Sequence, residues 1–210
     1  VEKEWLNKLK SIKKYHASGS LLDFGAGTGA FLQKAGAHFD IIGVEPSSRA
    51  VDHAPLSIKT RIYKNLASYK SEQKFDVITM WHVLEHLPNL SASFREIKDR
   101  LSKKGHLFIA VPNPNSWDSD YYGPHWAGYD VPRHLYHFGK KAMDAFLKPY
   151  HLRILETKPM TFDAYYVSML SERHLNNPYR FIRGLSIGYR SNKSARTSQQ
   201  YSSLLYVIGA

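Results

Sequence analysis

A carboxylate followed by alternating glycines gives this sequence its clearest chemical pattern. Residues 21–29 read LLDFGAGTG. Glycine lets a backbone adopt positive φ and approach a ligand closely, because no side chain stands between them. Asp23, two residues before the first glycine, would repel a pyrophosphate but attract a cationic group. The stretch therefore predicts a strand, a tight turn and a helix start that together hold a nucleotide-like ligand carrying positive charge.

Two other interpretations fit the same glycines. Gly25, Gly27 and Ala30 also satisfy the dinucleotide-binding pattern G-x-G-x-x-G/A, so an NAD-dependent oxidoreductase is one alternative. A plain strand-to-helix turn without a ligand is the other.

Histidines supply a second set of reactive side chains. His82, Glu85 and His86 match H-x-x-E-H, the inverted zinc-peptidase motif. That chemistry needs both histidines on one face of a long helix and a further acidic ligand. Here the motif directly follows a predicted strand, and Pro88 comes two residues later. A turn in which His86 hydrogen-bonds to the backbone is the simpler interpretation.

Composition limits the class of protein. The 210 residues are 43% hydrophobic, include no cysteine and contain no apolar run of membrane-spanning length. Disulfides, thiolate metal sites and cysteine nucleophiles are therefore excluded, and we expect a cytoplasmic protein without a membrane span. The net charge of +11 favours an anionic partner, which could be a phosphorylated small molecule, a nucleic acid or a membrane surface.

Strands alternating with helices must position these side chains. Apolar runs predict strands at 20–24, 40–45, 60–63, 75–81, 106–111, 152–157 and 204–208, with helices between most of them. This order predicts an α/β fold with a doubly wound, mainly parallel, seven-stranded sheet. Ligands of such sheets bind beyond the carboxyl ends of the strands, where Gly25, Glu45 and Trp81 fall.

We divide the chain, which we predict to be a single domain, into four parts. An amphipathic helix spans 1–17, with Trp5, Leu6, Leu9 and Ile12 toward the core and its lysines, Lys8 included, in solvent. The core comprises 18–111, 138–160 and 201–210, and the fourth predicted helix runs from Leu90 to Leu101. The aromatic segment 112–137, called the lid here, and the arginine-rich segment 161–200, called the basic cap, are predicted additions over the ligand end.

In order along the chain, the glycine stretch, the strand ending in Glu45, FDVI at 75–78, WHVLEHLP at 81–88 and GHLFIAVPN at 105–113 resemble class I S-adenosylmethionine (SAM) dependent methyltransferases. The likeness is to the small-molecule branch that includes the ubiquinone-biosynthesis O-methyltransferases. The lid resembles a subgroup with a Trp followed by Pro-x-His-Leu, here Trp126 and PRHL at 132–135. The resemblance implies a Rossmann-like fold, SAM as cofactor and S-adenosylhomocysteine (SAH) as product. We expect no metal, because the sequence shows no carboxylate cluster placed to chelate an acceptor.

The resemblance also implies roles for particular residues. Glu45 would accept both ribose hydroxyls, and Asp23 would lie near the methionine amino group. His134 is the first candidate for a general base that takes the acceptor proton, with His137 and His86 behind it. The remaining predicted cofactor contacts are Gly25, Ala26, Gly27, Thr28, Gly29, Pro46, Trp81 and His82.

The acceptor is predicted to be a small molecule methylated on oxygen, in preference to nitrogen or carbon. Arginines crowd the basic cap, and their planar guanidinium groups suit phosphate or carboxylate, so we expect an anionic acceptor or one on an anionic carrier. A solvated helix face is the ordinary alternative for these charges. An RNA methyltransferase, or another basic nucleic-acid-binding protein, is the less favoured function. The predicted substrate contacts are Trp126, Tyr129, Arg133, Tyr165, Arg180 and Arg183.

Overall fold

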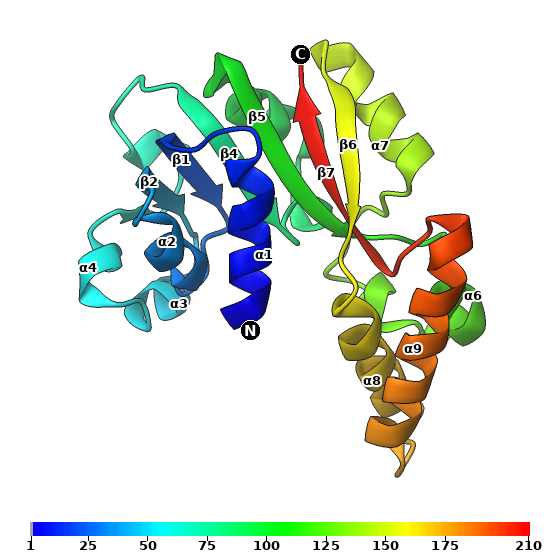
Figure 1. Ribbon diagram of the computed structural model, residues 1–210. Helices are drawn as coiled ribbons and strands as arrows, with labels where there is room; N and C mark the ends of the chain where they lie inside the picture. Colours follow the sequence, from blue (N-terminus) through cyan, green and yellow to red (C-terminus); the bar gives the residue numbers. More distant parts are fainter. Residues whose placement is uncertain (1) are drawn as a thin grey trace. The chain divides into compact units, whose positions relative to one another are not determined.

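The computed structural model describes residues 2–210, with side chains from Trp5 onward, so Val1 lies outside the described residues. Its strands are β1 Gly19–Phe24, β2 Phe39–Val44, β3 Ile62–Tyr63, β4 Phe75–Trp81, β5 Leu101–Pro112, β6 Arg153–Pro159 and β7 Ser203–Gly209. They form one seven-stranded sheet in the order β3-β2-β1-β4-β5-β7-β6, which is mixed but mostly parallel (Figure 1). The predicted α/β, doubly wound fold is confirmed.

The helices connect these strands. They are α1 Glu2–Lys13, α2 Ala30–Ala35, α3 Ser48–Asp52, α4 Leu56–Lys59, α5 Leu90–Asp99, α6 Trp117–Tyr122, α7 Lys140–Leu147, α8 Asp163–His174 and α9 Arg180–Ser198. Single 3₁₀ turns occupy Leu66–Ser68, Leu84–His86, Gly123–His125, Ala127–Tyr129 and Lys148–Tyr150. Within the described residues, no helix is both long and apolar enough to cross a membrane.

The sheet reverses its order at β1. Strand β1 pairs in parallel with β2 on one side and with β4 on the other. The carboxyl ends of these three strands therefore lie next to one another, and they lead into Gly25, Glu45 and His82. In doubly wound sheets this switch point is where ligands bind.

Two compact units make up the chain, and each is described by itself. The first comprises residues up to 83, 89–108 and 208–210; the second comprises 84–88 and 109–207. In the first unit the core lies among β1, β2, β4, α2 and α5, where Leu21, Leu22, Val77 and Phe94 have no exposed surface. These apolar residues fall on the predicted buried strands and helix.

Helix α1 differs from its prediction in the placement of two side chains. Leu9 and Ile12 are buried as expected, but Leu6 is 56% exposed and Lys8 is only 6% exposed. Placing Leu6 in the core and Lys8 in solvent was therefore wrong. The helix also ends at Lys13, where the N–H groups of Tyr15 and His16 both donate to the carbonyl of Ile12.

The start of β5 also differs from the prediction. Helix α5 ends at Asp99, and Leu101 already belongs to the strand, so the predicted helix extended too far. Gly105, expected to follow the end of this helix, lies inside β5. A Cβ there would come within 2.8 Å of the Phe75 carbonyl oxygen, so glycine allows a close backbone approach.

In the second unit, the lid contains regular structure that the sequence did not predict. Helix α6 and two 3₁₀ turns pack around Trp126, which is 1% exposed. Its indole N–H donates to Asp118 at 2.8 Å, and the hydroxyls of Ser191 and Ser202 donate to the same carboxylate at 2.6 and 2.7 Å. Three segments distant in sequence thus meet at one buried carboxylate.

The basic cap is a helical hairpin. Helices α8 and α9 run side by side away from β6 and β7, as Figure 1 shows. Two glycines of α9 permit this close contact, because a Cβ at Gly184 would lie 2.7 Å from the Cα of Met169 and one at Gly188 would lie 2.7 Å from the Cα of Tyr165. The hairpin buries Val167 and Ile187 against Trp126 of the lid.

Candidate cofactor and lid sites

The glycine turn, residues 25–29, adopts the backbone that its sequence predicts. Gly25, Gly27 and Gly29 all have positive φ, at 84°, 55° and 72°. A Cβ on Gly25 would lie 2.3 Å from Val83 Cγ2, and one on Gly29 would lie 2.8 Å from Ile58 Cγ2. A Cβ on Gly27, in contrast, would meet nothing within 4 Å. Gly27 therefore faces open space, whereas the other two glycines permit tight packing behind the turn.

Glu45 holds the turn through one of its carboxylate oxygens. Its Oε2 accepts from the backbone N–H of Gly27 at 2.8 Å, and its Oε1 accepts from that of Ser47 at 2.9 Å. The side chain is half-buried at the end of β2. Each carboxylate oxygen can accept more than one hydrogen bond, so Glu45 can also accept from a ligand.

Asp23 is a buried acid at the end of β1. Its side chain is 1% exposed, and the hydroxyl of Thr79 on β4 donates to its Oδ1 at 2.6 Å. Burial raises the pKa of Asp23 to about 7, while the Thr79 hydrogen bond and the charge of Lys8 lower this pKa and the charge of Glu45 raises it. Asp23 therefore changes charge near neutral pH.

Lys8 and Thr79 belong to this site, and the sequence analysis missed both. The Lys8 ammonium lies 4.2 Å from the ring centre of Trp5 and 4.6 Å from that of Trp81. Such contacts stabilise a cation that burial separates from water. A signal for Lys8 was present, because residues 5, 8, 9 and 12 recur at the spacing of one helix face.

The strand ends bring the other predicted cofactor residues to the switch point. Trp81 is half-buried at the end of β4, and Pro46 is exposed directly after Glu45. His82 has a left-handed backbone with φ 56°, which is uncommon outside glycine and is often found at functional sites. Thr28 is exposed in the glycine turn, and Ala26 is buried behind it.

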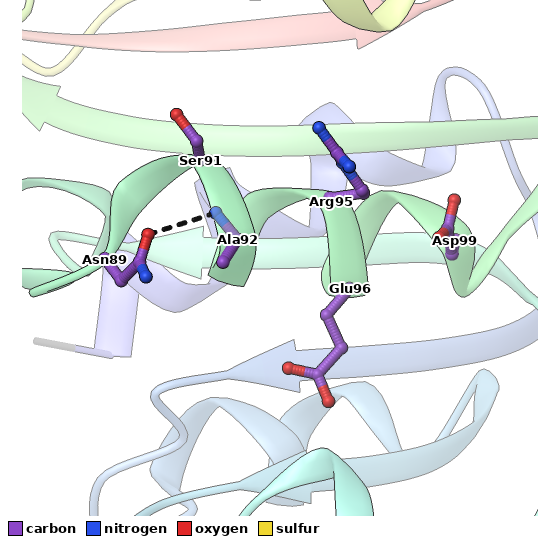
Figure 2. Close-up of a pocket in the computed structure, with 6 residues that line it drawn as sticks. All are labelled: Asn89, Ser91, Ala92, Arg95, Glu96 and Asp99. Atoms are coloured by element: carbon purple, nitrogen blue, oxygen red, sulfur yellow. Dashed lines mark hydrogen bonds between the residues drawn. The ribbon is translucent and has the colours of Figure 1, made fainter.

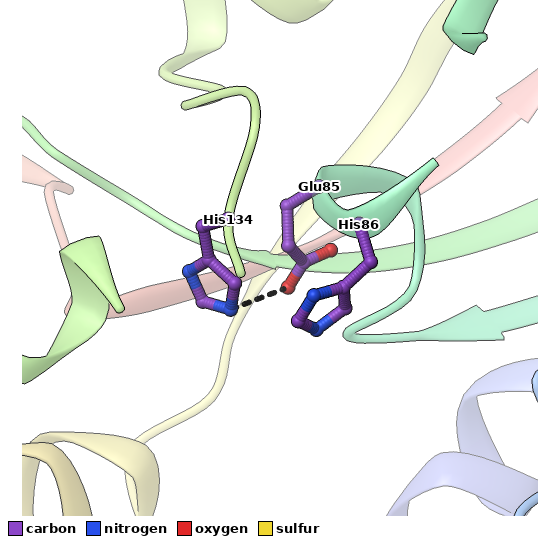
Figure 3. Close-up of side chains that lie close together, drawn as sticks. All are labelled: Glu85, His86 and His134. Carbon is purple, nitrogen blue, oxygen red and sulfur yellow. Dashed lines mark ion pairs between the residues drawn. The ribbon is translucent and has the colours of Figure 1, made fainter. Parts of the chain in front are cut away.

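A second candidate site lies in the other unit, where the lid meets the turn Leu84–His86. Figure 3 shows His134 and His86 pointing toward the carboxylate of Glu85. His134 Nε2 lies 4.0 Å from Glu85 Oε1, and the two imidazole rings meet edge to face with centres 4.6 Å apart. Burial lowers the pKa of His134, so this imidazole tends to be neutral.

The predicted turn at His86 is confirmed. His86 Nδ1 lies 3.0 Å from the backbone carbonyl of Arg133, and the surrounding segment is a 3₁₀ turn of three residues. The zinc-peptidase arrangement needs a long helix that carries His82 and His86 together. The structure gives these residues no such helix.

Other lid residues do not join this cluster. His137 is exposed and packs edge to face on Tyr129, with ring centres 5.2 Å apart. Although the residue is exposed overall, partial burial of its ring lowers the pKa of His137. Arg133 is exposed and its Nη2 pairs with Asp130 Oδ2 at 2.5 Å. The predicted catalytic role of His137 and substrate role of Arg133 stay predictions.

The two arginines of the basic cap that we predicted to contact the substrate differ in their surroundings. Arg183 Nε lies 3.4 Å from the buried Glu172, and its Nη2 donates to the Tyr121 hydroxyl at 3.0 Å. Arg180 is exposed and lies over the Phe181 ring. Tyr165 is half-buried where α8 meets α9, and Trp126 lies in the core of this unit. The structure gives Trp126 a packing role, and its contact with a substrate stays a prediction.

Two surface pockets of the first unit lie away from the predicted site residues. One is a shallow hollow along α5 lined by Asn89, Arg95 and Glu96, among others, and Figure 2 shows Asn89 accepting from the N–H of Ala92. Another lies near Gly36 and Arg61, by the start of β2. None of the predicted site residues lines either pocket, so we assign them no function.

Comparison with known proteins agrees with this geometry. Residues 2–157 match the family described as "Methyltransferase domain". The chain belongs to this family, as the sequence motifs predicted.

A ubiquinone biosynthesis O-methyltransferase from Pelagibacter ubique (strain HTCC1062) is 30% identical over 115 residues, which cover 50% of this chain and 47% of the relative. The match thus spans about half the length of that curated relative.

Solved structures share the fold. The YcgJ protein from Bacillus subtilis superposes with a TM-score of 0.59 at 16% identity, covering 99% of this chain and 96% of that one. Phosphoethanolamine N-methyltransferase 2 from Haemonchus contortus, solved in complex with SAM, superposes with a TM-score of 0.60 at 17% identity, covering 98% of this chain and 52% of that one. At these identities the likeness is one of fold.

Proposed function

We propose that this chain is a SAM-dependent methyltransferase that acts on a small-molecule acceptor. The observation that carries the proposal is the switch point itself. There Asp23, the open face of Gly27 and the carboxylate of Glu45 lie at or just beyond the carboxyl ends of the neighbouring strands β1 and β2. Two comparisons support SAM as the cofactor: membership of the methyltransferase-domain family, and the SAM bound to the Haemonchus contortus enzyme.

These residues fit SAM better than a pyrophosphate-containing cofactor. A buried acid at the end of β1 favours an ammonium or sulfonium and disfavours phosphate. Glu45, already fixed by the Gly27 and Ser47 N–H groups, presents its remaining lone pairs to paired ribose hydroxyls. The empty space at Gly27 leaves room for a ligand against the backbone.

In the proposed reaction, SAM supplies a methyl group on an already activated sulfonium. A lone pair of the acceptor forms the new bond to the methyl carbon while the carbon–sulfur bond breaks. The electrons of the broken carbon–sulfur bond go to sulfur, which gives SAH. The protein then has to align the acceptor in line with that bond and to take up the proton of an acceptor hydroxyl. His134, His137 and His86 are the proposed bases, in this order.

An oxygen of an anionic or carrier-linked small molecule is the proposed methyl acceptor. The curated Pelagibacter ubique relative is named as an O-methyltransferase, which supports oxygen. The exposed Arg180 and the aromatic side chains of the basic cap support an anionic acceptor. No metal is required for the transfer step as written.

Isothermal titration calorimetry with SAM, SAH and NAD tests the proposal. We expect SAM and SAH to bind with one site per chain and NAD to give no heat of binding. Glu45→Ala removes charge-assisted hydrogen bonds, worth about 1.5 to 3 kcal/mol each, and should weaken SAH binding by at least about tenfold. Glu96→Ala on α5 is the matched control. Equal SAH affinity in the Glu45→Ala variant and the control would overturn the cofactor assignment.

A further inference from the structure

Helix α9 presents apolar side chains to solvent along one line. Ile182, Leu185 and Tyr189 are 72%, 53% and 56% exposed. They recur three and four residues apart, so they are neighbours on the helix surface. The residues of α9 that pack inside the unit lie on another side of the helix, and they are Gly184, Ile187, Gly188, Ser191 and Ala195. Single exposed apolar residues are ordinary, but an aligned set marks a surface that binds a partner.

The same line continues into two basic side chains. Lys193 and Arg196 follow at intervals of four and three residues, and both are exposed. Arg183 and Arg190 lie on a different flank, against aromatic side chains of α6. From Ile182 to Arg196 the line extends about 21 Å, at about 1.5 Å per residue, which is the length of a partner helix of about four turns.

We propose that this line, called the α9 stripe and made of Ile182, Leu185, Tyr189, Lys193 and Arg196, docks an acidic amphipathic helix of another protein. The partner helix would place apolar side chains against the first three residues and carboxylates against the last two. An antiparallel partner is favoured, because its carboxylates then stand in its first turn, where the helix dipole stabilises them. Apolar anchors spaced three and four residues apart are the usual contacts between packed helices.

Charge favours an acidic partner over a second copy of this chain. Helix α9 has five basic residues and no acidic one. Two parallel copies of the stripe would set Lys193 and Arg196 against the same cations. Two antiparallel copies would set these cations against Ile182 and Leu185. Neither arrangement pairs the charges, and unpaired charge at an interface weakens binding.

An anionic membrane or a nucleic acid fits the pattern less well. Helices that lie on membranes separate apolar and basic residues around the helix, on opposite faces. The α9 stripe separates them along the helix, with apolar residues toward its start and basic ones toward its end. A nucleic acid would pair its phosphates with the cations but would leave Ile182 and Leu185 against a charged backbone.

Binding of a synthetic helical peptide to the full chain tests the proposal. The peptide carries glutamates in its first turn and leucines after them, at the spacing of the α9 stripe taken in reverse. A control peptide holds the same residues in the opposite order. We expect fluorescence anisotropy to show saturable binding of the first peptide and about tenfold weaker binding of the control. The test uses no SAM, so its outcome is independent of the cofactor assignment.

Variants of the chain locate the binding. Leu185→Ser should weaken peptide binding by about tenfold, because it removes apolar contact area, whereas exposed Leu155→Ser on β6 is the matched control. Lys193→Glu combined with Arg196→Glu should abolish binding of the acidic peptide. The same double variant should bind a peptide in which lysines replace the glutamates. Exchanging both exposed lysines at 103 and 104 of β5 for glutamate gives a control of equal net charge.

NMR of the unmodified chain makes the test independent of how the variants fold. The acidic peptide should shift backbone resonances of residues 182–196 more than those of α7, and the absence of such shifts would overturn the proposal. Equal affinity for the two peptides, or equal affinity in the stripe variants and their controls, would also overturn it. Vesicles of phosphatidylglycerol that bind in place of the peptide would make the stripe a membrane contact, and dimers dissociated by Leu185→Ser in sedimentation would assign it to a second copy.

Discussion

The ammonium of Lys8 lies 4.6 Å from the ring centre of Trp81 and 4.2 Å from that of Trp5. Trp81 packs in turn on Phe31 of α2, with ring centres 5.2 Å apart. A cation is thus held by aromatic rings in the same unit as Asp23, whose pKa it lowers. The N-terminal helix therefore takes part in the electrostatics of the proposed cofactor site.

Replacing Lys8 should change the pH dependence of cofactor binding. Lys8→Met keeps an unbranched side chain against the indoles but removes the charge, so the pKa of Asp23 should rise above about 7. Less of Asp23 would then be ionised at neutral pH, and SAH should bind more weakly at pH 7 than at pH 8 by a larger factor than in the unmodified chain. Calorimetry at a series of pH values measures this, with exposed Lys10→Met as control. Identical pH profiles for the two variants would show that Lys8 does not act on Asp23.

Asp23 should also make folding stability depend on pH. Its folded pKa of about 7 lies above its unfolded value of about 3.9, so the folded chain retains a proton that the unfolded chain loses. This contribution is fully present below about pH 4 and is lost as pH rises to about 7. Across that window the loss should be on the order of 4 kcal/mol at most, from roughly three pKa units.

Asp23→Asn isolates this effect. Urea unfolding at several pH values should show that stability relative to the unmodified chain is nearly constant above about pH 7 and changes between about pH 4 and 7. The variant lacks the titrating group, so the difference in unfolding free energy carries the signature of Asp23 alone. A difference that is flat over the whole range would mean that Asp23 is ionised throughout.

Substituting two glycines of the glycine turn should distinguish an effect on folding from an effect on cofactor binding. Gly25→Ala puts a methyl group 2.3 Å from Val83 in addition to its positive φ, so it should destabilise the chain strongly. Gly27→Ala meets no neighbouring atom, so its backbone cost should be about 1 to 2 kcal/mol. Its methyl group would nevertheless enter the proposed cofactor space.

Thermal unfolding and SAH titration of both variants check this prediction. We expect Gly27→Ala to remain folded at 25 °C with SAH binding greatly reduced. If Gly27→Ala bound SAH normally, the open space at this glycine would not be where the cofactor lies.

Local patterns were enough to predict the sheet and the glycine turn. Strand β4 begins and ends where the mainly apolar stretch from Phe75 to Trp81 does, because apolar side chains on both faces suit a buried parallel strand. The positive φ values follow from glycine spacing alone. Ser47 caps α3 through a hydrogen bond from the Ala50 N–H at 3.3 Å, as serine directly before a helix commonly does.

Features that depend on distant residues could not be read in this way. Asp118 is buried because Trp126, Ser191 and Ser202 reach it from separate segments, and nothing near it in sequence indicates this. The cluster of His134 with Glu85 has the same origin. Lys8 is a charged example. Helical spacing places it on the buried face of α1, whereas its positive charge favoured a position in solvent, and the structure buries it.

The arginines of the basic cap should divide by function. Arg183 faces Glu172, which is 1% exposed and also accepts hydrogen bonds from Tyr122 and Asn177, whereas Arg180 lies exposed at the start of α9. Arg183→Ala removes the countercharge of a buried carboxylate and should lower the unfolding temperature. Arg180→Ala should leave that temperature unchanged and affect only the binding of an anionic acceptor.

Adding Glu172→Gln to Arg183→Ala removes the uncompensated charge, so stability should recover in part. If Arg183→Ala and Arg180→Ala unfold at the same temperature, Glu172 does not depend on Arg183, and both arginines would then be candidates for binding the acceptor.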